Sequence, residues 1–209
     1  MASQKCPENQ RIDLEFIFVF EVTMKIIKTQ LQKFQYFYPY TVALIGAEAE
    51  GKKNFMSCAW HTALSFEPPL FGVLISRKRF THQIISKARE FTVNFIHKKQ
   101  VMLSARYGRK SGFDMDKIGR FPLKLAPSKI IHSPIIDDAY VCFECTLIDA
   151  RPYGDHDLFV GEVLAIHEEE GSFSDEGVLN PQNVQPLMYL GSDFYLTIDP
   201  DSLQHVLPD

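Results

Sequence analysis

The stretch that decides the fold is "NFMSCAWHTALSFEPPLFGVLIS", residues 54–76, which is followed directly by "RKRFTHQ" at 77–83. Its first part places small polar residues around Trp60, the only Trp of the chain. The prolines at 68–69 lack the amide that a sheet ladder needs, so they end the strand. The apolar run 70–76 then indicates a second, buried strand. Two strands around a sharp stop favour antiparallel pairing through hairpins.

The rest of the chain also predicts strands that are joined by turns. Residues 40–48 are apolar and predict a buried strand, 49–53 a turn, and 54–60 the returning arm of a hairpin. Further strands are predicted at 91–96, 139–150, 156–168 and 187–198. A turn-rich loop joins the strands 139–150 and 156–168 into a hairpin. Helices are expected after Thr81, taken as an N-cap, and over 98–108, with Gly108 as the stop. Strands without regular βα alternation predict a mainly β, antiparallel barrel with a few short helices inserted.

Composition limits the partners. The chain has 209 residues and a net charge of −4, with 22 basic and 26 acidic side chains, which disfavours a nucleic-acid binder. Its four cysteines, Cys6, Cys58, Cys142 and Cys145, are few and irregularly spaced, so we expect a reducing cytoplasm. No apolar run reaches transmembrane length, so no membrane partner is expected.

The N-terminal residues differ in character from the rest. The run 14–20 resembles the apolar part of a signal peptide, but Asp13 and Glu15 stand where positive charge is required. We therefore expect an N-terminal arm or extra strand over 1–35, one barrel domain over 36–198 and a C-terminal tail over 199–209.

Standard catalytic motifs are absent. The sequence has no G-x-G-x-x-G, no Walker A loop and no G-x-S-x-G elbow. The C-x-x-C at 142–145 has two readings, a metal or redox pair and two small apolar side chains in a strand. We favour the second, because residues three apart on a strand face opposite sides.

The segment 54–65 has the residues that a flat heteroaromatic ligand needs. Extended backbone places Asn54, Met56, Cys58 and Trp60 on one face and the intervening side chains on the other. Small residues let backbone amides approach the edge of a ring, while Trp60 supplies an aromatic wall. Short polar arms come from Asn54, Ser57, Thr62 and Ser65. The alternative is an ordinary strand with a core Trp.

The basic cluster that follows has the residues of a phosphate site. Arg77 and Arg79 share a face if the strand persists, and Thr81 would cap the next helix. Helix N-terminal amides, a hydroxyl and two guanidiniums together bind phosphate well. A ring-edge site followed by a phosphate site describes a site for flavin mononucleotide (FMN). The alternative is a solvated basic turn.

The order N-x-M-S-x-x-W-x-T-x-x-S-x-x-P-P, followed by S-R-x-R-x-T, resembles the flavin reductase-like, FMN-binding split-barrel family, and in particular its flavoredoxin group. The blocks at 90–96, 143–147, 154–163 and 186–196 are similar to later blocks of that family, so the resemblance covers about residues 36–197.

The resemblance implies a Greek-key split β-barrel that forms a homodimer and binds FMN without a covalent bond near the dimer interface. It implies that Asn54, Ser57, Cys58, Ala59 and Trp60 lie along the ring and ribityl chain. Thr62 and Ser65 would support them, and His156 would face the cofactor or the nicotinamide. The phosphate would be held by Ser76, Arg77, Arg79 and Thr81.

Three functions follow as hypotheses. The first is an FMN-dependent oxidoreductase that takes electrons from NADH or NADPH and passes them to an acceptor. The second is an FMN electron-transfer protein that a protein partner reduces. The third, from a different class, is a flavin-free barrel that binds a small ligand.

Overall fold

The computed structural model describes residues 25–31 and 34–207. The chain divides into two compact units, Met1–Gln35 and Tyr36–Asp209. In the first unit, the described residues 25–31 and 34–35 contain no helix or strand. The arm or extra strand expected around 14–20 lies outside the described residues, and the predicted domain boundaries remain a prediction.

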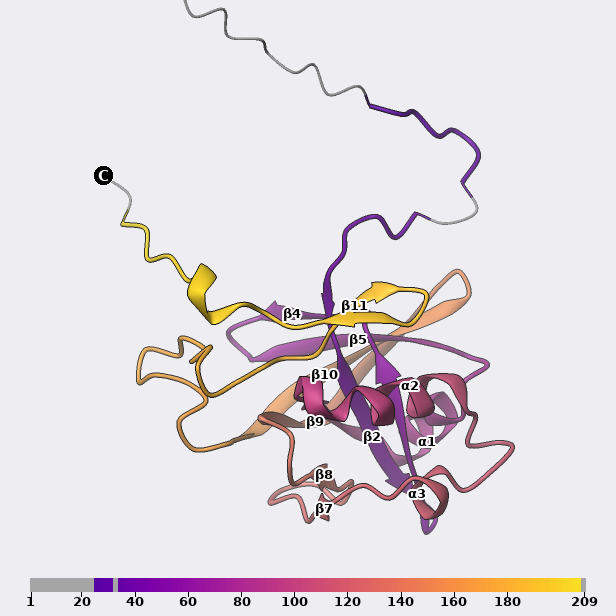
Figure 1. The fold of residues 1–209 in the computed structure, drawn as a ribbon. Helices are drawn as coiled ribbons and strands as arrows, with labels where there is room; N and C mark the ends of the chain where they lie inside the picture. Colours follow the sequence, from indigo (N-terminus) through magenta and orange to yellow (C-terminus); the bar gives the residue numbers. More distant parts are fainter. Residues whose placement is uncertain (1–24, 32–33, 208–209) are drawn as a thin grey trace, which may run out of the picture. The chain divides into compact units, whose positions relative to one another are not determined.

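The second unit is built mainly from antiparallel strands, as predicted (Figure 1). The strands are β1 (Tyr40–Thr41), β2 (Ala43–Ala49), β3 (Lys52–Cys58), β4 (His61–Ser65), β5 (Leu70–Ser76), β6 (Glu90–Phe95), β7 (Leu125–Ala126), β8 (Ile135–Ile136), β9 (Val141–Tyr153), β10 (His156–Glu168), β11 (Met188–Gly191) and β12 (Phe194–Leu196). The main sheet has seven strands in the order β3-β2-β6-β9-β10-β5-β4. Its two edge strands, β3 and β4, are consecutive in the chain, so the sequence crosses from one edge of the sheet to the other between Cys58 and His61.

The helices are α1 (Phe80–Ala88), α2 (Val101–Arg109) and α3 (Lys117–Arg120), with 3₁₀ turns at Lys98–Gln100 and Pro200–Ser202. Figure 1 shows the three α-helices at the β2–β3 end of the sheet, and each of them contacts β3. None of the helices in the described part of the chain is long and apolar enough to span a membrane.

The β2–β3 hairpin turns at Glu50 and Gly51, within the predicted turn. Both residues have positive φ, 52° and 72°, which suits the backbone twist of a two-residue hairpin. Gly46 lies opposite Phe55 in this hairpin. A Cβ at Gly46 would lie 2.2 Å from the Phe55 ring, so the aromatic side chain of β3 packs directly on the backbone of β2.

Strand β2 is buried on both faces, which explains its nearly continuous apolar sequence. Ala43 and Ile45 pack in one hydrophobic cluster with Phe91 and Phe159. Leu44 packs in a second cluster on the other side. The alternation predicted for β3 is present too: Met56 and Cys58 face the first cluster, and Phe55 faces the second.

Two helix boundaries differ from the sequence prediction. Helix α1 begins at Phe80, its N-cap is Arg79, and Thr81 lies buried in the first turn. The Thr81 hydroxyl has a tertiary partner on β3, Asn54, in place of a local capping bond. Helix α2 continues past Gly108 to Arg109. Gly108 is not among the glycines with positive φ, the conformation that a glycine stop uses, and it faces the Ser57 side chain of β3.

The long hairpin β9–β10 carries the C-x-x-C pair. Cys145 is fully buried in the first hydrophobic cluster, and Cys142 is buried in the second. The two thiols therefore lie on opposite faces of β9, as strand alternation predicts, and they cannot chelate one ion together.

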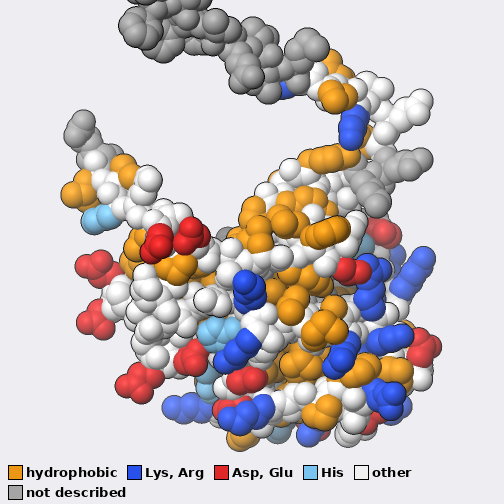
Figure 2. Space-filling view, in the orientation of Figure 1, with side chains coloured by type: hydrophobic (Ala, Val, Ile, Leu, Met, Phe, Trp, Pro, Cys, Tyr) orange, Lys and Arg blue, Asp and Glu red, His pale blue; other side chains and the backbone are white. Residues whose placement is uncertain are grey.

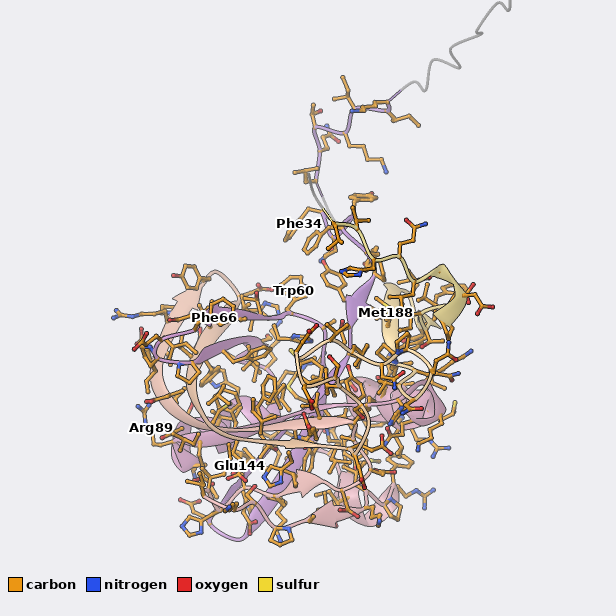
Figure 3. The ribbon with its side chains drawn as sticks, turned by 90° about the vertical axis from the view of Figure 1, so that its left-hand side faces the viewer. Phe34, Trp60, Phe66, Arg89, Glu144 and Met188 are labelled. Atoms are coloured by element: carbon orange, nitrogen blue, oxygen red, sulfur yellow. The ribbon has the colours of Figure 1, made fainter. Side chains whose placement is uncertain are left out.

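A buried carboxylate organises the irregular loop beside β9. Glu144 is fully buried and accepts hydrogen bonds from the backbone amides of Lys129, Ile130 and Ile131, at 2.7, 2.7 and 3.1 Å. His167 on β10 contacts the same carboxylate at 2.5 Å. In Figure 3, Glu144 lies far from Trp60, so this loop anchor is separate from the segment 54–65.

We expect Glu144→Gln to lower the free energy of unfolding by about 2 kcal/mol at pH 7, because charge-assisted hydrogen bonds are lost. Burial alone would raise the pKa of Glu144, but the Lys129 amide, His167 and two further amides outweigh it, so the pKa is lowered. A lowered folded-state pKa stabilises the fold above the unfolded value of about 4.3, and this contribution is lost as pH falls through the folded value.

Urea unfolding at pH 7 and at pH 3 measures this effect, with the exposed Glu168→Gln on the neighbouring strand as the control. The gap between wild type and Glu144→Gln should shrink at pH 3. A gap that is equal at both pH values would contradict a stabilising role for the ionised Glu144 carboxylate.

Candidate functional site

The backbone leaves the sheet at the centre of the predicted site. The last pair of the β2–β3 ladder joins Ala43 to Cys58, so the amide of Ala59 lies beyond the ladder. The carbonyl of Trp60 then accepts a hydrogen bond from the Leu74 amide at 2.9 Å, which leads the chain into β4. This two-residue step, from one edge strand to the other, presents backbone polar groups outside the sheet.

A cavity of about 290 Å³ lies beside this step. Four of the predicted cofactor residues line it: Ser57, Cys58, Ala59 and Arg79. The opposite walls come from Ser104, Ala105, Gly108 and Arg109 of α2 and from Tyr189, Asp193 and Tyr195 of the β11–β12 hairpin. The cavity therefore combines small side chains, two phenol rings, the Arg79 guanidinium and the ion pair of Arg109 with Asp193.

Cys58 contributes volume rather than reactivity to this cavity. Its side chain is 5 % exposed, and burial raises the pKa of its thiol to about 12. The thiol also donates a weak hydrogen bond to the Trp60 carbonyl at 3.4 Å. A thiol in this state is not a nucleophile near neutral pH.

Asn54 and Thr81, also predicted as cofactor residues, do not line this cavity and instead bind each other. The Asn54 side-chain amide donates to the Thr81 hydroxyl over 2.6 Å, and both residues are buried. This bond joins β3 to the first turn of α1 and so fixes where the helix begins, with Arg79 as its N-cap.

The two arginines of the predicted phosphate cluster point to different partners. Strand β5 ends at Ser76 and a turn follows, in which the Arg79 amide donates to the Ser76 carbonyl, so the two side chains do not share a strand face as predicted. Arg77 donates to the Asp157 carboxylate at 2.8 Å, and Asp157 also contacts His82 at 2.8 Å. Arg77 and then His82 hold the pKa of Asp157 below its usual value.

Arg79 turns toward α2 instead. Its guanidinium donates to the Gly108 carbonyl at 3.2 Å, near the C-terminal end of α2, and remains exposed beside the cavity. Arg79 is thus the cavity's own cation, while Arg77 has a carboxylate partner on β10.

Two further predicted residues, Trp60 and His156, contact each other. The centroid of the Trp60 ring lies 5.0 Å from that of the His156 ring, and His156 is the first residue of β10. His156 is paired in register with Ser76, and its Nδ1 contacts the Asp155 carboxylate at 2.7 Å. Thr62 and Ser65 lie farther along β4, where Thr62 is exposed and Ser65 is half-buried. Figure 3 labels Trp60 at this end of the molecule.

Sequence reasoning missed the residues of α2 and of the β11–β12 hairpin. Ser104 and Gly108 are small residues four apart in a helix, a spacing that marks a close-packing face. The bond that the Ser57 hydroxyl donates to the Ser104 carbonyl at 2.5 Å shows that contact. The tyrosines at 189 and 195 carried no signal of their own, because their position depends on the pairing of β11 with β1 and β12.

Residues 35–196 match the model of the flavin reductase like domain. The chain belongs to the flavin reductase-like family. This agrees with the resemblance in the segment 54–81 and makes the chain a member of a family of flavin-binding oxidoreductases.

Solved structures support the same fold. An FMN-binding protein from Thermus thermophilus, with bound 1-cyclohex-2-enone, is 36 % identical with a TM-score of 0.78, over 87 % of this chain and 100 % of that one. A flavoredoxin from Methanosarcina acetivorans is 27 % identical with a TM-score of 0.74, over 84 % and 92 % of the two chains. A flavin reductase from Pseudomonas putida is 29 % identical over 133 residues, 63 % of this chain and 75 % of its own length.

Metal chemistry has no site in the described part of the chain, where no three His, Cys, Asp or Glu side chains gather closely enough to hold an ion. The titratable groups near the cavity instead form pairs: Arg109 with Asp193, and Arg77 with Asp157.

Proposed function

We propose that the chain binds FMN at the backbone step between Ser57 and Trp60 and transfers electrons from NADH or NADPH to an acceptor. The observation that carries the proposal is the cavity beside this step, where an amide outside the sheet ladder, small side chains and the Arg79 guanidinium converge. The step occurs inside the sequence block that carries the family resemblance.

The residues present suit this cofactor chemically. Ser57, Cys58 and Ala59 are small enough to let a ring system approach the backbone, and Arg79 supplies positive charge for a phosphate. Arg109 also lines the cavity, but it is already bound to Asp193. Arg79 is the principal phosphate residue in this proposal, because Arg77 is already bound to Asp157. The buried Asn54–Thr81 pair holds the first turn of α1 against β3, which positions Arg79 beside the cavity.

The cofactor supplies the redox chemistry, since bound FMN takes up a hydride from a nicotinamide and releases electrons to an acceptor. The protein's part is to orient the bound flavin and its electron donor. Trp60 and His156 form an aromatic wall at the end of β10, and Asp155 orients the His156 imidazole through Nδ1. This leaves Nε2 of His156 to position a donor or to move a proton.

The double substitution Arg77→Ala and Arg79→Ala should weaken FMN binding strongly and leave riboflavin binding nearly unchanged. A charge-assisted contact to phosphate contributes about 1.5–3 kcal/mol, so losing the Arg79 contact should cost roughly 10–100-fold in affinity for FMN. Fluorescence titration with each ligand measures both affinities.

The single variants separate the two arginines. Arg79→Ala should account for most of the loss, and Arg77→Ala should change FMN affinity little. Equal loss of FMN and riboflavin affinity in the double variant would contradict the phosphate assignment.

The second hypothesis, an electron carrier reduced by a protein partner, is tested with the same holoprotein. Mixing it with NADH or NADPH without oxygen should bleach the visible absorption of the flavin if the first hypothesis holds. His156→Ala should slow this bleaching at least tenfold while FMN affinity changes less than threefold.

The outcomes divide the hypotheses cleanly. A yellow protein that neither nucleotide bleaches supports the carrier, and a protein that stays colourless after FMN addition supports the flavin-free binding module. An unchanged bleaching rate in His156→Ala removes His156 from the mechanism.

We also propose that the chain forms a homodimer through the outer face of β4, β5 and β10. Leu64, Leu74 and Leu158 point away from the core cluster on this side, and Leu64 is 44 % exposed. Phe66, at the end of β4, is 99 % exposed (Figure 3). A second copy of the chain offers the matching apolar face.

The cytoplasm remains the proposed compartment, supported by the free thiols of Cys58, Cys142 and Cys145.

Phe66→Asp should weaken this dimer at least tenfold, because an exposed aromatic side chain at an interface is a common hot spot. Substitution of a side chain that is 99 % exposed should not disturb the fold. Sedimentation velocity measures the dissociation constant, with Met102→Asp, at an exposed apolar residue of α2, as the control. A wild-type monomer, or a dimer unaffected by Phe66→Asp, would contradict the proposed face.

A further inference from the structure

Helix α2 and the 3₁₀ turn before it present a basic outer surface. Residues 98–113 contain five Lys and Arg side chains and no Asp or Glu. One of the five, Arg109, is bound to Asp193. The other four are exposed and, among residues 25–31 and 34–207, form no ion pair with a carboxylate: Lys98, Lys99, Arg106 and Lys110. We call these four and Met102, which lies among them, the α2 face.

The stability of the helix does not account for this charge. Lys98 and Lys99 precede the N-terminal end of α2, where the helix dipole disfavours positive charge, and the first turn of α2 has no acid. Arg106 and Lys110 are four residues apart, so their like charges repel each other. Charges that gather against the preference of the helix point to a role in binding something outside this chain.

An exposed apolar side chain lies among the cations. Met102 is 59 % exposed, and it stands three residues after Lys99 and four before Arg106, so the three share one side of the helix. An apolar centre with a charged rim is typical of protein–protein interfaces, in which Met and Arg are enriched. A nucleic acid would use the cations but would gain little from Met102, and the net charge of −4 opposes its approach. The α2 face therefore fits the surface of an acidic protein best.

The opposite side of α2 belongs to the candidate flavin site. Ser104, Ala105 and Gly108 line the 290 Å³ cavity. A helix with its side chains is about 10–12 Å across, so only this thickness separates the α2 face from the cavity. A protein that docks on the α2 face would therefore stand close to a flavin bound in the cavity.

The charge of the whole molecule would orient such a partner. Residues 77–120 carry 12 Lys and Arg against 3 acids, whereas residues 137–209 carry 16 acids against one Arg. Figure 2 shows Lys and Arg around the position where Figure 1 draws α2, and Asp and Glu toward the loop that follows β10. A field with two such poles attracts an acidic surface to one side of the molecule and repels it from the other.

We propose that the α2 face docks an acidic protein, which is the electron acceptor of the bound flavin. The docking stands on the residues of α2, and only the redox role of the partner rests on the proposed function. A hydride brings two electrons to the flavin, so an acceptor with one iron–sulfur centre would dock twice. It would take one electron each time, and the proton of the hydride would be released to solvent.

Two small acidic iron–sulfur proteins, a rubredoxin and a [2Fe–2S] ferredoxin, are the probes. Isothermal titration of the full chain, with and without FMN, measures their binding. We expect at least one of them to bind saturably at about 20 mM salt, near one per chain, and at least tenfold more weakly at about 300 mM salt, because salt screens exposed charges.

Absence of binding by both probes would overturn the proposal. Polyadenylate and vesicles that contain phosphatidylserine are the comparison anions, and tighter binding of either one than of both proteins would overturn it too. A chain that binds a probe but no FMN would contradict only the proposed function.

Charge reversal locates the docking surface. The double variant Lys98→Glu and Lys99→Glu should weaken probe binding at least tenfold. It should keep or raise the unfolding midpoint, because acids suit the N-terminal end of a helix. The matched control, Lys124→Glu and Lys129→Glu, makes the same change in net charge at exposed lysines beside β7 and should weaken binding less than threefold. Equal weakening in the two double variants would overturn the assignment to the α2 face.

Discussion

The hydrogen bond between the Asn54 amide and the Thr81 hydroxyl is the constraint on which the candidate site depends. It joins the edge strand β3 to the first turn of α1 inside the core, at 2.6 Å and with both partners buried. Buried polar groups are costly unless they are paired, so this contact specifies one register of helix against strand. It also explains why Arg79, two residues before Thr81, lies beside Ser57 and Ala59 and reaches the end of α2.

Around this contact, the sheet holds the backbone in place up to the candidate site. The β2–β3 hairpin is buried on both faces and holds the residues up to Cys58 rigidly. The backbone then leaves the ladder for two residues and enters the opposite edge strand. A rigid scaffold that ends in a short irregular segment is a common way to present backbone groups to a ligand. The cations that flank it differ in availability, since Asp157 binds Arg77, while Arg79 contacts only a carbonyl among the described residues.

Much of this arrangement could be predicted from the sequence. The apolar runs, the Glu50–Gly51 turn and the prolines at 68–69 specify hairpins, and hairpins specify antiparallel pairing. The block from Asn54 to Thr81 then identified the family that the match over residues 35–196 shows. The local rules failed where tertiary partners replaced local ones. Thr81 looks like an N-cap in the sequence, but it bonds to Asn54, twenty-seven residues away. The cavity residues of α2 and β11–β12 could be identified only from the tertiary structure, because nothing in the sequence indicates that Tyr189 lies near Ser57.

Trp60, the chain's only Trp, can report directly on flavin binding at the backbone step. Purified protein is titrated with FMN while Trp fluorescence and the visible spectrum are recorded together. We expect saturable quenching of Trp60 emission at about one FMN per chain, with a matching change in the flavin spectrum. Unchanged Trp60 emission, with FMN remaining free in solution, would contradict a flavin site at this backbone step.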